Sequence, residues 1–418
     1  MTRTMKVFAF TLAAMAAISF TACGGGGGGD KKLRFYYYKQ EIKDALREMC
    51  DAFTNKNPDI EIDLEVAPND GEAGLKTGLL GGTGPDLIQL QSYSAVFEFA
   101  KAGYLADLTT DPVMAQVVDS AKGSVTYKGK QYAVPMDLAG IGIIYNKKIF
   151  AKFGLKPPTT LSELKTVCAT LKKNKVTPFA GLLKENWSVG HFLSMVHTTL
   201  AGSRLTNWME QMNEGKASFA DPVNKKDVFA LLDFYKNNMD PRASEFGWNE
   251  QQAAFAKGEA AMMVQGLWSY GAALNTETNL DCGFIAFPCN DNVADTKLFV
   301  DVDSTIAVNA GSSPDKIKKA KRFLAWIATP EGTRFWVEKC KLVPTFKNAD
   351  ISVMKQPFQD LVSYVKADKV NPWAFSSYPV SVWEDAVKNG AQEYLFGKKN
   401  ADQVISYIDS SWKKAVGK

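Results

Sequence analysis

The chain has 418 residues, with 49 basic and 45 acidic side chains and a formal net charge of +4. This near-neutral balance, with lysines scattered along the chain, argues against a nucleic-acid partner. The length is sufficient for two domains or for one large bilobed unit.

The N-terminal segment has the layout of a secretory signal peptide. Arg3 and Lys6 precede a mostly apolar run over residues 7–20, which is followed by two small residues and Cys23. The run is shorter than the roughly 20 residues of a membrane span, and no later run reaches that length. "FTAC" (20–23) resembles a bacterial lipobox, with Phe20 where the usual pattern has leucine. We therefore expect residues 1–22 to be removed and Cys23 to be lipidated; ordinary signal cleavage, which would leave Cys23 as a thiol, is the alternative.

Six consecutive glycines follow Cys23. Glycine has no side chain to bury and loses the most backbone entropy on ordering, so a packed domain would not use such a run. A glycine-rich stretch of seven residues reaches roughly 15 Å. Residues 23–30 therefore predict a lipidated cysteine on a flexible linker.

The chain after this linker alternates between strand and helix patterns. Residues 33–38 are rich in β-formers, 41–58 carry a helical apolar face, and 60–66 alternate strictly between apolar and polar residues. Further strands are expected at 85–90 and 141–145, and a hairpin at 126–135 around Lys128-Gly129. A helix is expected to begin at Thr160, which forms a capping box with Glu163.

The C-terminal half continues the alternation. Strands are expected at "AAMMVQ" (260–265), "CGFIAF" (282–287) and "STIAV" (304–308). A helix follows with Ser313 as N-cap and Pro314 in its first turn, and the tail from about residue 350 is expected to be helical. The pattern predicts an α/β architecture with helix-covered sheets.

No motif indicates catalysis or a metal. The histidines, His191 and His197, accompany no HExxH, GxSxG or Walker pattern. Besides Cys23, the five cysteines are expected to be small buried hydrophobes, since an odd number cannot all pair and no CxxC spacing occurs. The carboxylate pair Asp301 and Asp303 leaves a glycan-active enzyme as a minor alternative. Neither a cofactor nor a metal is expected.

Several segments, in order, resemble the sugar-binding extracellular solute-binding proteins of ABC importers, the family that includes the maltose-binding protein. They span about residues 33–415: "LGGTGPDLIQL", "YAVPMDLAGIGIIYNKKIFAKFGLKPPTTLSELKTVCATLK", "FAKGEAAMMVQGLWSYGAAL", "KAKRFLAWIATPEG" and "GAQEYLFGKKNADQVISYI".

This resemblance implies two discontinuous α/β lobes with a ligand cleft between them. Lobe one would comprise residues 31–138 and 297–343, and lobe two residues 141–293 and 346–418. The hinge crossings would lie at 139–142, 294–297 and 343–346. Hinge closure would trap a ligand in the cleft.

The candidate ligand-binding residues are aromatic, carboxylate and amide side chains, which suit the chemistry of a sugar. Aromatic rings cover the C–H face of a pyranose, and planar polar groups bind its hydroxyls. Trp268 directly follows a strand and falls on the family's sugar-stacking position. The resemblance also implies that Trp187 occupies one of the family's aromatic site positions and that Trp383 is a tail-helix aromatic facing the cleft. Trp326 and Trp336 are expected in the core, while Trp248 and Trp373 have no assigned place.

Polar candidates follow the same logic. The resemblance implies ligand contacts from residues at strand ends and at the first crossing, and we expect Asp86 to have a structural role in capping its local turn. The polar candidates are Gln40, Glu41, Gln91, Ser92, Tyr93, Asp137, Asp301 and Asp303.

The sequence thus predicts a lipid-anchored carbohydrate receptor of the cell envelope, monomeric, that delivers its ligand to ABC permease subunits. The alternative within the same fold is a receptor for a non-sugar solute such as glycerol phosphate or a polyamine. A phosphate ligand would favour Arg or Lys in the cleft, and the candidates above are carboxylates, amides and aromatics.

Overall fold

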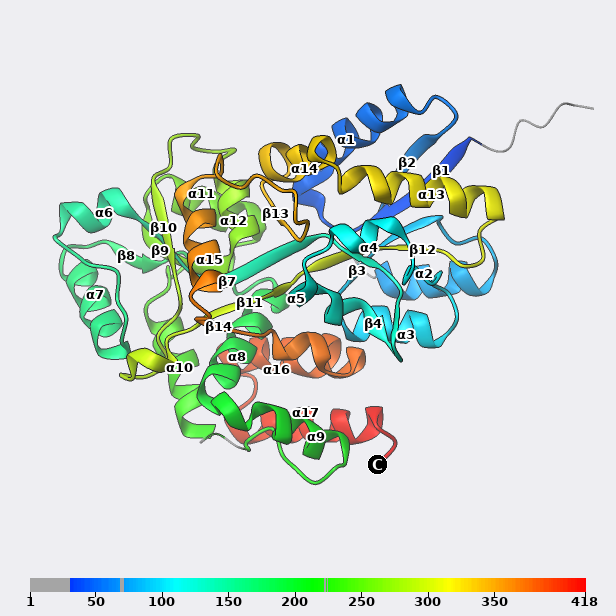
Figure 1. Cartoon of the computed structure of the whole chain (residues 1–418). Coiled ribbons are helices and arrows are strands. Elements are labelled where there is room, and N and C mark those ends of the chain that lie inside the picture. Colours follow the sequence, from blue (N-terminus) through cyan, green and yellow to red (C-terminus); the bar gives the residue numbers. More distant parts are fainter. Residues whose placement is uncertain (1–30, 68–70, 222, 224) are drawn as a thin grey trace, which may run out of the picture.

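The computed structural model describes residues 31–67, 71–221, 223 and 225–418. The predicted signal peptide, Cys23 and the glycine linker lie outside these residues. Within them the chain forms two lobes, one around a five-stranded sheet and the other around a seven-stranded sheet, both covered by helices (Figure 1). The prediction of a two-lobed α/β fold is confirmed.

Lobe one is built on the five-stranded sheet, whose strand order is β2-β1-β3-β12-β6. Strand β1 pairs in parallel with β2 and β3, and β12 runs antiparallel to β3 and β6. The carboxyl ends of β1, β3 and β6 therefore meet at one edge of the sheet, where β12 begins. The strands are β1 (Lys32–Tyr37), β2 (Glu61–Val66), β3 (Leu87–Gln91), β6 (Val134–Pro135) and β12 (Ser304–Val308).

Helices cover both faces of this sheet, with α1 and α13 on one side and α2 and α3 on the other (Figure 1). The helical elements of lobe one are η1 (Gln40–Ile42), α1 (Lys43–Lys56), α2 (Gly71–Leu80), α3 (Ser94–Lys101), α4 (Pro112–Gln116), α5 (Asp119–Lys122), η2 (Gly123–Val125), α13 (Pro314–Ile327), α14 (Pro330–Arg334) and the π-helical turn η5 (Phe335–Lys339).

Lobe two is organised around the long strand β7 (Asp137–Asn146). One edge of β7 pairs first with β11 and then with β10, and the other edge pairs first with β13 and then with β9. The chain passes from the lobe-one sheet to the lobe-two sheet between β6 and β7, and back between β11 and β12. The remaining strands are β8 (Thr177–Phe179), β9 (Ala260–Gly266), β10 (Cys282–Ile285), β11 (Leu298–Val302), β13 (Val343–Pro344) and β14 (Val370–Asn371).

The helices of lobe two also lie on both sides of its sheet, with α11, α12 and α15 opposite α8 and α10 (Figure 1). Its helical elements are α6 (Lys147–Lys152), α7 (Leu161–Lys173), α8 (Asn186–Ala201), η3 (Gly202–Arg204), α9 (Leu205–Asn213), α10 (Lys225–Asn237), α11 (Trp248–Ala256), α12 (Leu267–Ala273), η4 (Val293–Asp295), α15 (Gln356–Lys366), η6 (Ala374–Ser377), η7 (Val382–Val387), α16 (Lys388–Leu395) and α17 (Ala401–Ala415).

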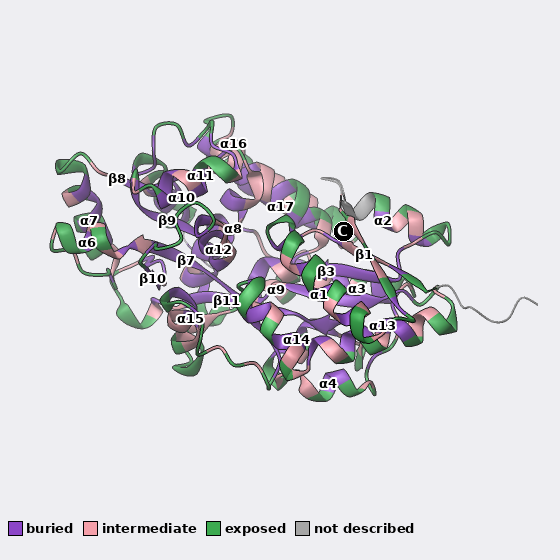
Figure 2. Cartoon of the chain, turned by 90° about the horizontal axis from the view of Figure 1, so that it is seen from above, coloured by how far each residue is buried: buried purple, intermediate pink, exposed green. Residues whose placement is uncertain are grey.

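Each lobe has its own hydrophobic core. The lobe-one core draws on residues 33–136 and 302–346, and lobe two contains two large buried clusters, one from residues 139–412 and one from residues 144–361. The central strands are buried, β2 at the sheet edge has no buried residue, and the outer helical faces are exposed (Figure 2). The lobe boundaries and hinge crossings implied by the resemblance stay predictions.

Local signals in the sequence explain several element ends. Thr160 and Glu163 form the expected capping box, and Ser313 accepts a hydrogen bond from the Lys316 amide as N-cap. The hairpin between β4 (Thr126–Tyr127) and β5 (Lys130–Gln131) turns at Lys128 and Gly129. Both have positive φ values, 47° and 77°, as a type I′ turn requires.

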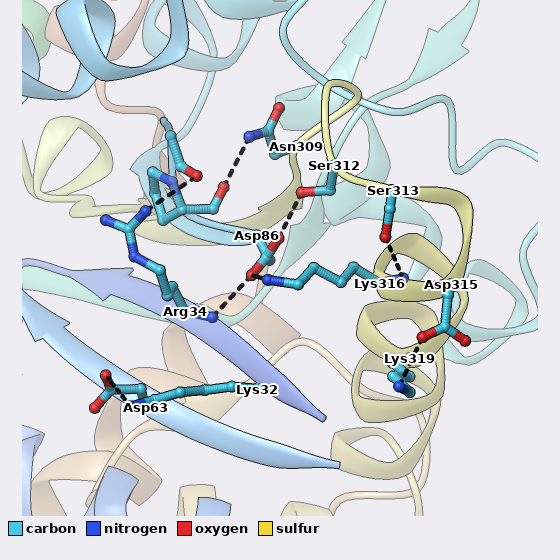
Figure 3. A network of polar contacts seen from close by, with 12 residues as sticks. Lys32, Arg34, Asp63, Asp86, Asn309, Ser312, Ser313, Asp315, Lys316 and Lys319 are labelled. Carbon is cyan, nitrogen blue, oxygen red and sulfur yellow. Dashed lines mark hydrogen bonds and ion pairs between the residues drawn. The ribbon is translucent and has the colours of Figure 1, made fainter. Parts of the chain in front are cut away.

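Asp86 has a structural role, but it does not cap its local turn as expected. Its carboxylate accepts hydrogen bonds from the Arg34 amide at 3.0 Å and from the Ser312 hydroxyl at 2.7 Å, and Lys316 Nζ lies 3.3 Å away (Figure 3). The side chain thus joins β1 to the start of α13. Turn propensity misled the prediction because these partners are distant in sequence.

The five cysteines of the described chain are free and buried, as predicted: Cys50, Cys168, Cys282, Cys289 and Cys340. Burial raises the pKa of each of these thiols, for Cys168 to about 12, so they remain protonated.

Candidate functional site

A buried lysine and three carboxylates lie where the chain passes between the lobes. Lys39 follows β1 and has a side chain only 3% exposed. Its ammonium pairs with Asp303, and lies 3.5 Å from Asp137 Oδ2 and 3.8 Å from Glu41 Oε1. We call these four residues the Lys39 cluster. They meet because the carboxyl ends of β1 and β6 and the start of β12 share one edge of the lobe-one sheet.

Neighbouring polar groups fix this cluster in place. Gln89 Oε1, on β3, accepts hydrogen bonds from the amides of Tyr38 (2.9 Å) and Lys39 (3.2 Å) and so holds the turn after β1. Asp137 Oδ1 accepts from the Ser304 hydroxyl at 2.5 Å and from the Ser304 amide at 3.3 Å. The other oxygen of Asp137, Oδ2, is buried without a hydrogen-bond donor.

Burial and the neighbouring charges together set the pKa values of the cluster. Burial disfavours the charged form of Lys39, but the carboxylates of Asp137, Asp303 and Glu41 hold its pKa well above the ordinary value. Burial raises the pKa of Asp137 to about 6; Asp303 adds to this rise, and Lys39 opposes it. Burial also raises the pKa of Glu41.

Trp268 presents an indole to this cluster from lobe two. It is the second residue of α12, directly after β9, and Lys39 Nζ lies 5.7 Å from its ring centroid. The ring packs on Gly266, where a Cβ atom would overlap its six-membered part. The Gly-x-Trp sequence is therefore a steric requirement, because only glycine allows the indole to lie against the strand end.

A group of aromatic rings continues from Trp268 into lobe two. The Trp268 ring centroid lies 6.0 Å from that of His191 and 6.1 Å from that of Trp373, in both cases edge to face. Phe375 stacks on Trp373 at 5.2 Å. Burial, together with nearby Lys388, lowers the pKa of His191 to about 3, so this imidazole is neutral.

A second contact joins the lobes beside the cluster. Asp301, on β11, accepts hydrogen bonds from Tyr93 Oη at 2.9 Å and from the Trp373 amide at 3.1 Å. Tyr93 has a φ of 55° and ψ of −110°, a strained conformation for a non-glycine residue. Burial raises the pKa of Asp301. This carboxylate therefore links the end of β3 to the aromatic group.

The space between the lobes is small in this arrangement. Glu41 of lobe one and Trp268 and Asn275 of lobe two line a hollow of about 100 Å³, closed by Lys341 and Leu342. Since a buried water needs roughly 10–15 Å³, the hollow has room for a few waters but not for a saccharide. A saccharide could enter this space only if the lobes moved apart.

The structure brings several of the predicted residues together and separates others. Glu41, Asp137 and Asp303 meet around Lys39 and face Trp268, and Tyr93 meets Asp301.

Gln40 is exposed on η1, and the Ser92 hydroxyl donates a hydrogen bond to the Val302 carbonyl at 2.6 Å. Gln91 is half-buried at the end of β3 and lines a hollow of about 20 Å³ beside Phe375.

The other two predicted tryptophans, Trp383 and Trp187, pack against other aromatic rings. Trp383 is 3% exposed and stacks on Phe375 at 4.3 Å and on His191 at 5.5 Å, so its ring faces are already covered. It also lines, with Gln91 and Ser92 of lobe one, the hollow of about 20 Å³, so its place in the ligand cleft stays a prediction. Trp187, at the start of α8, lies 5.7 Å from Trp248 and from His191, at the edge of the aromatic group.

Sequence reasoning missed Lys39 and left Trp373 unplaced. A signal was available for Lys39, because it lies beside Gln40 and Glu41 at the carboxyl end of the first parallel strand. Trp373 carried no such signal. It joins the site through the tail, where its indole N–H donates to the Phe299 carbonyl at 2.9 Å.

Within residues 31–67, 71–221, 223 and 225–418, no group of three or more His, Cys, Asp or Glu side chains is arranged to hold a metal ion. No helix in the same part of the chain has the length and apolarity needed to cross a membrane.

The raised pKa of Asp137 predicts a specific pH dependence of stability. Its folded-state pKa of about 6 exceeds the ordinary value near 4, so the folded protein binds this proton more tightly than the unfolded chain. The stabilisation is complete only below about pH 3 and is lost as the pH rises through 6. The free energy of unfolding of the wild type, minus that of Asp137→Asn, should therefore fall by about 2 kcal/mol from pH 4 to pH 7. Denaturant titrations at each pH test this, and a difference independent of pH would show that Asp137 has an ordinary pKa.

Comparisons with known proteins agree with this architecture. A family model described as bacterial extracellular solute-binding protein matches residues 39–334. A multiple sugar-binding protein of Streptococcus mutans is 26% identical over 296 residues, which cover 70% of this chain and 69% of the relative. A melibiose/raffinose/stachyose-binding protein of Bacillus subtilis is 22% identical over 351 residues, covering 82% and 80%.

A solved structure of the solute-binding protein RafE in complex with raffinose shares the fold. Its TM-score is 0.81 at 21% sequence identity, and the superposition covers 92% of this chain and 99% of that one.

Proposed function

Because the chain belongs to the bacterial extracellular solute-binding protein family, we propose that it binds a mono- or oligosaccharide between its lobes for delivery to an ABC permease. The site supports this ligand class with one observation above all. Trp268 projects an indole from lobe two toward a carboxylate-rich cluster on lobe one. The proposed function contains no catalytic step.

This arrangement matches the two surfaces of a sugar ring. The indole would cover the apolar C–H face, and Glu41, Asp137 and Asp303 would accept hydrogen bonds from hydroxyls. Trp187, Trp373, Tyr93 and Asp301 would extend the contacts along a longer ligand. The named ligands of the relatives in Streptococcus mutans and Bacillus subtilis belong to the same class.

A saccharide should produce a thermal shift that charged rivals do not. At a ligand concentration of 100 times Kd the folded state gains about 2.7 kcal/mol. We would screen raffinose, maltotriose and diacetylchitobiose against glycerol 3-phosphate and spermidine, and confirm hits by titration calorimetry. Stabilisation by glycerol 3-phosphate or spermidine, with none by any saccharide, would refute the proposal.

We further propose that the mature protein is a monomer held at the cell envelope by lipid on Cys23, through the glycine linker. Several acyl chains would anchor the protein stably, whereas a single chain would bind only marginally. The outer faces of both lobes would then contact the permease subunits.

Replacing Cys23 with alanine should move the protein from the membrane to the soluble fraction, because no other segment of the chain predicts an anchor. Fractionation of cells that express each form, followed by immunoblotting, measures this. Cys50→Ala is the matched control, since Cys50 is buried and should leave the distribution unchanged. A Cys23→Ala protein that stays with the membrane would contradict lipid anchoring.

A further inference from the structure

The charges of the Lys39 cluster do not balance. One ammonium faces the three carboxylates of Glu41, Asp137 and Asp303, a net formal charge of −2. Asp301 adds a fourth carboxylate on the same β11–β12 segment, and its partners are a tyrosine hydroxyl and a backbone amide rather than a cation. The wall between the lobes is therefore acidic.

Other cations near the two hollows contact groups outside the Lys39 cluster, although Lys339 and Lys341 line the larger hollow and the charge of Lys341 meets only a backbone carbonyl. Lys388 pairs with Glu384 at 2.6 Å, and Lys339 pairs with Glu48 at 2.9 Å. Lys341 is exposed and donates to the Glu338 carbonyl. His191 is neutral, as described above. Within the described chain, these contacts leave Lys39 as the cation that pairs with the three carboxylates.

Buried polar atoms in the same place still lack hydrogen-bond partners. Asp137 is 1% exposed, and its Oδ2 receives no hydrogen bond; its ion-pair distance to Lys39 Nζ is 3.5 Å. Tyr38 Oη, next to Lys39 in the chain, is also buried without a partner. An ionised carboxylate only accepts hydrogen bonds, so its partner must donate. Hydroxyl and ammonium groups donate, whereas a second carboxylate or a phosphate brings like charge.

We propose that the cleft selects saccharides by charge, accepting neutral and amino sugars and rejecting sugars that carry a carboxylate or a phosphate. This inference rests on the carbohydrate function proposed above and names the ligand class within it. Glu41, Asp137 and Asp303 are the specificity-determining residues. Lys39 compensates part of their charge, so the rejection of anions comes from the excess carboxylates.

Matched derivatives of one saccharide separate charge from size. The neutral saccharide with the largest thermal shift among raffinose, maltotriose and diacetylchitobiose would be converted at one primary hydroxyl to the uronate and, separately, to the 6-amino compound. Two like charges roughly 6 Å apart at an effective dielectric constant of about 20 change an affinity by about 100-fold. Calorimetry at low salt should show the uronate binding about 100-fold or more weakly than the amine.

Variants identify the residues responsible. Asp303→Asn should raise the affinity for the uronate relative to the amine by about 10-fold or more. Glu41→Gln, whose side chain is 22% exposed and is the most weakly engaged of the three, should act in the same direction and provides a second test if Asp303→Asn folds poorly. Asp63→Asn, on the outer edge of lobe one and paired with Lys32, is the control and should leave the ratio unchanged.

The outcomes distinguish the two proposals. Equal affinities for the uronate and the amine, whether strong or weak, would overturn charge selection and leave saccharide binding intact. Failure of every saccharide to bind would refute the proposed function, and the charge selection would fall with it.

Discussion

Replacing Trp268 with alanine should weaken saccharide binding by about 30- to 1,000-fold and cost less stability than loss of a core tryptophan. An aromatic contact contributes about 0.5–1.5 kcal/mol beyond the area it buries, and burial of a large side chain adds roughly 1.5–3 kcal/mol. The total of about 2–4 kcal/mol gives this change in affinity. Trp268 is only half-buried and packs at the margin of the lobe-two core, so less packing is lost.

Trp336→Ala is the matched control for this experiment. Trp336 is fully buried in the core of lobe one, and its loss should cost about 3–5 kcal/mol of unfolding free energy. The folded fraction of this variant should bind with nearly unchanged affinity. Calorimetric titration and denaturant unfolding of both variants separate the two roles. Unchanged affinity in Trp268→Ala, together with severe destabilisation, would remove Trp268 from the site.

Replacing Lys39 with methionine should destabilise the protein by about 3–5 kcal/mol at neutral pH, because three largely buried carboxylates lose their ammonium. Without Lys39 the pKa values of Asp137 and Glu41 should rise further, so protonation relieves the repulsion as the pH falls. The loss in unfolding free energy should therefore be smaller at pH 5 than at pH 7.5.

Denaturant unfolding at the two pH values measures this effect. Lys130→Met serves as control, because Lys130 pairs with Asp107 at an exposed site and should change stability far less. A loss in Lys39→Met that is equally large at both pH values would show that the carboxylates are not the source of the destabilisation.

Much of the fold was predictable because local patterns and structure agree. The strands expected at 33–38, 85–90, 141–145, 260–265, 282–287 and 304–308 overlap β1, β3, β7, β9, β10 and β12. The capping box at Thr160 and the turn at Lys128-Gly129 also occur as expected. Trp268 was predictable as a corner residue, since Gly266 must leave room for its ring. In such places short-range sterics and hydrogen bonding decide the conformation.

The rest of the site depends on contacts between distant segments. Lys39 is buried only because Asp137 and Asp303 reach the same sheet edge from positions about 100 and 260 residues away. Trp383 stacks on Phe375 and on His191 of α8, contacts that its position in the tail did not indicate. Periodicity and composition carry no information about contacts between distant segments. The sequence therefore indicated the correct end of the lobe-one sheet but did not identify Lys39 as the cation at the centre of the cluster.

Solution scattering with and without a saturating saccharide tests the central claim, ligand capture between two lobes. Entry requires the lobes to separate, and contacts to both lobes give the closed state its higher affinity. The account predicts a smaller radius of gyration when the saccharide identified by calorimetry is bound, and no such change for Trp268→Ala at the same concentration if that concentration lies below its weakened Kd. A radius that is unchanged while the wild-type protein binds the saccharide would contradict closure around a ligand in the cleft.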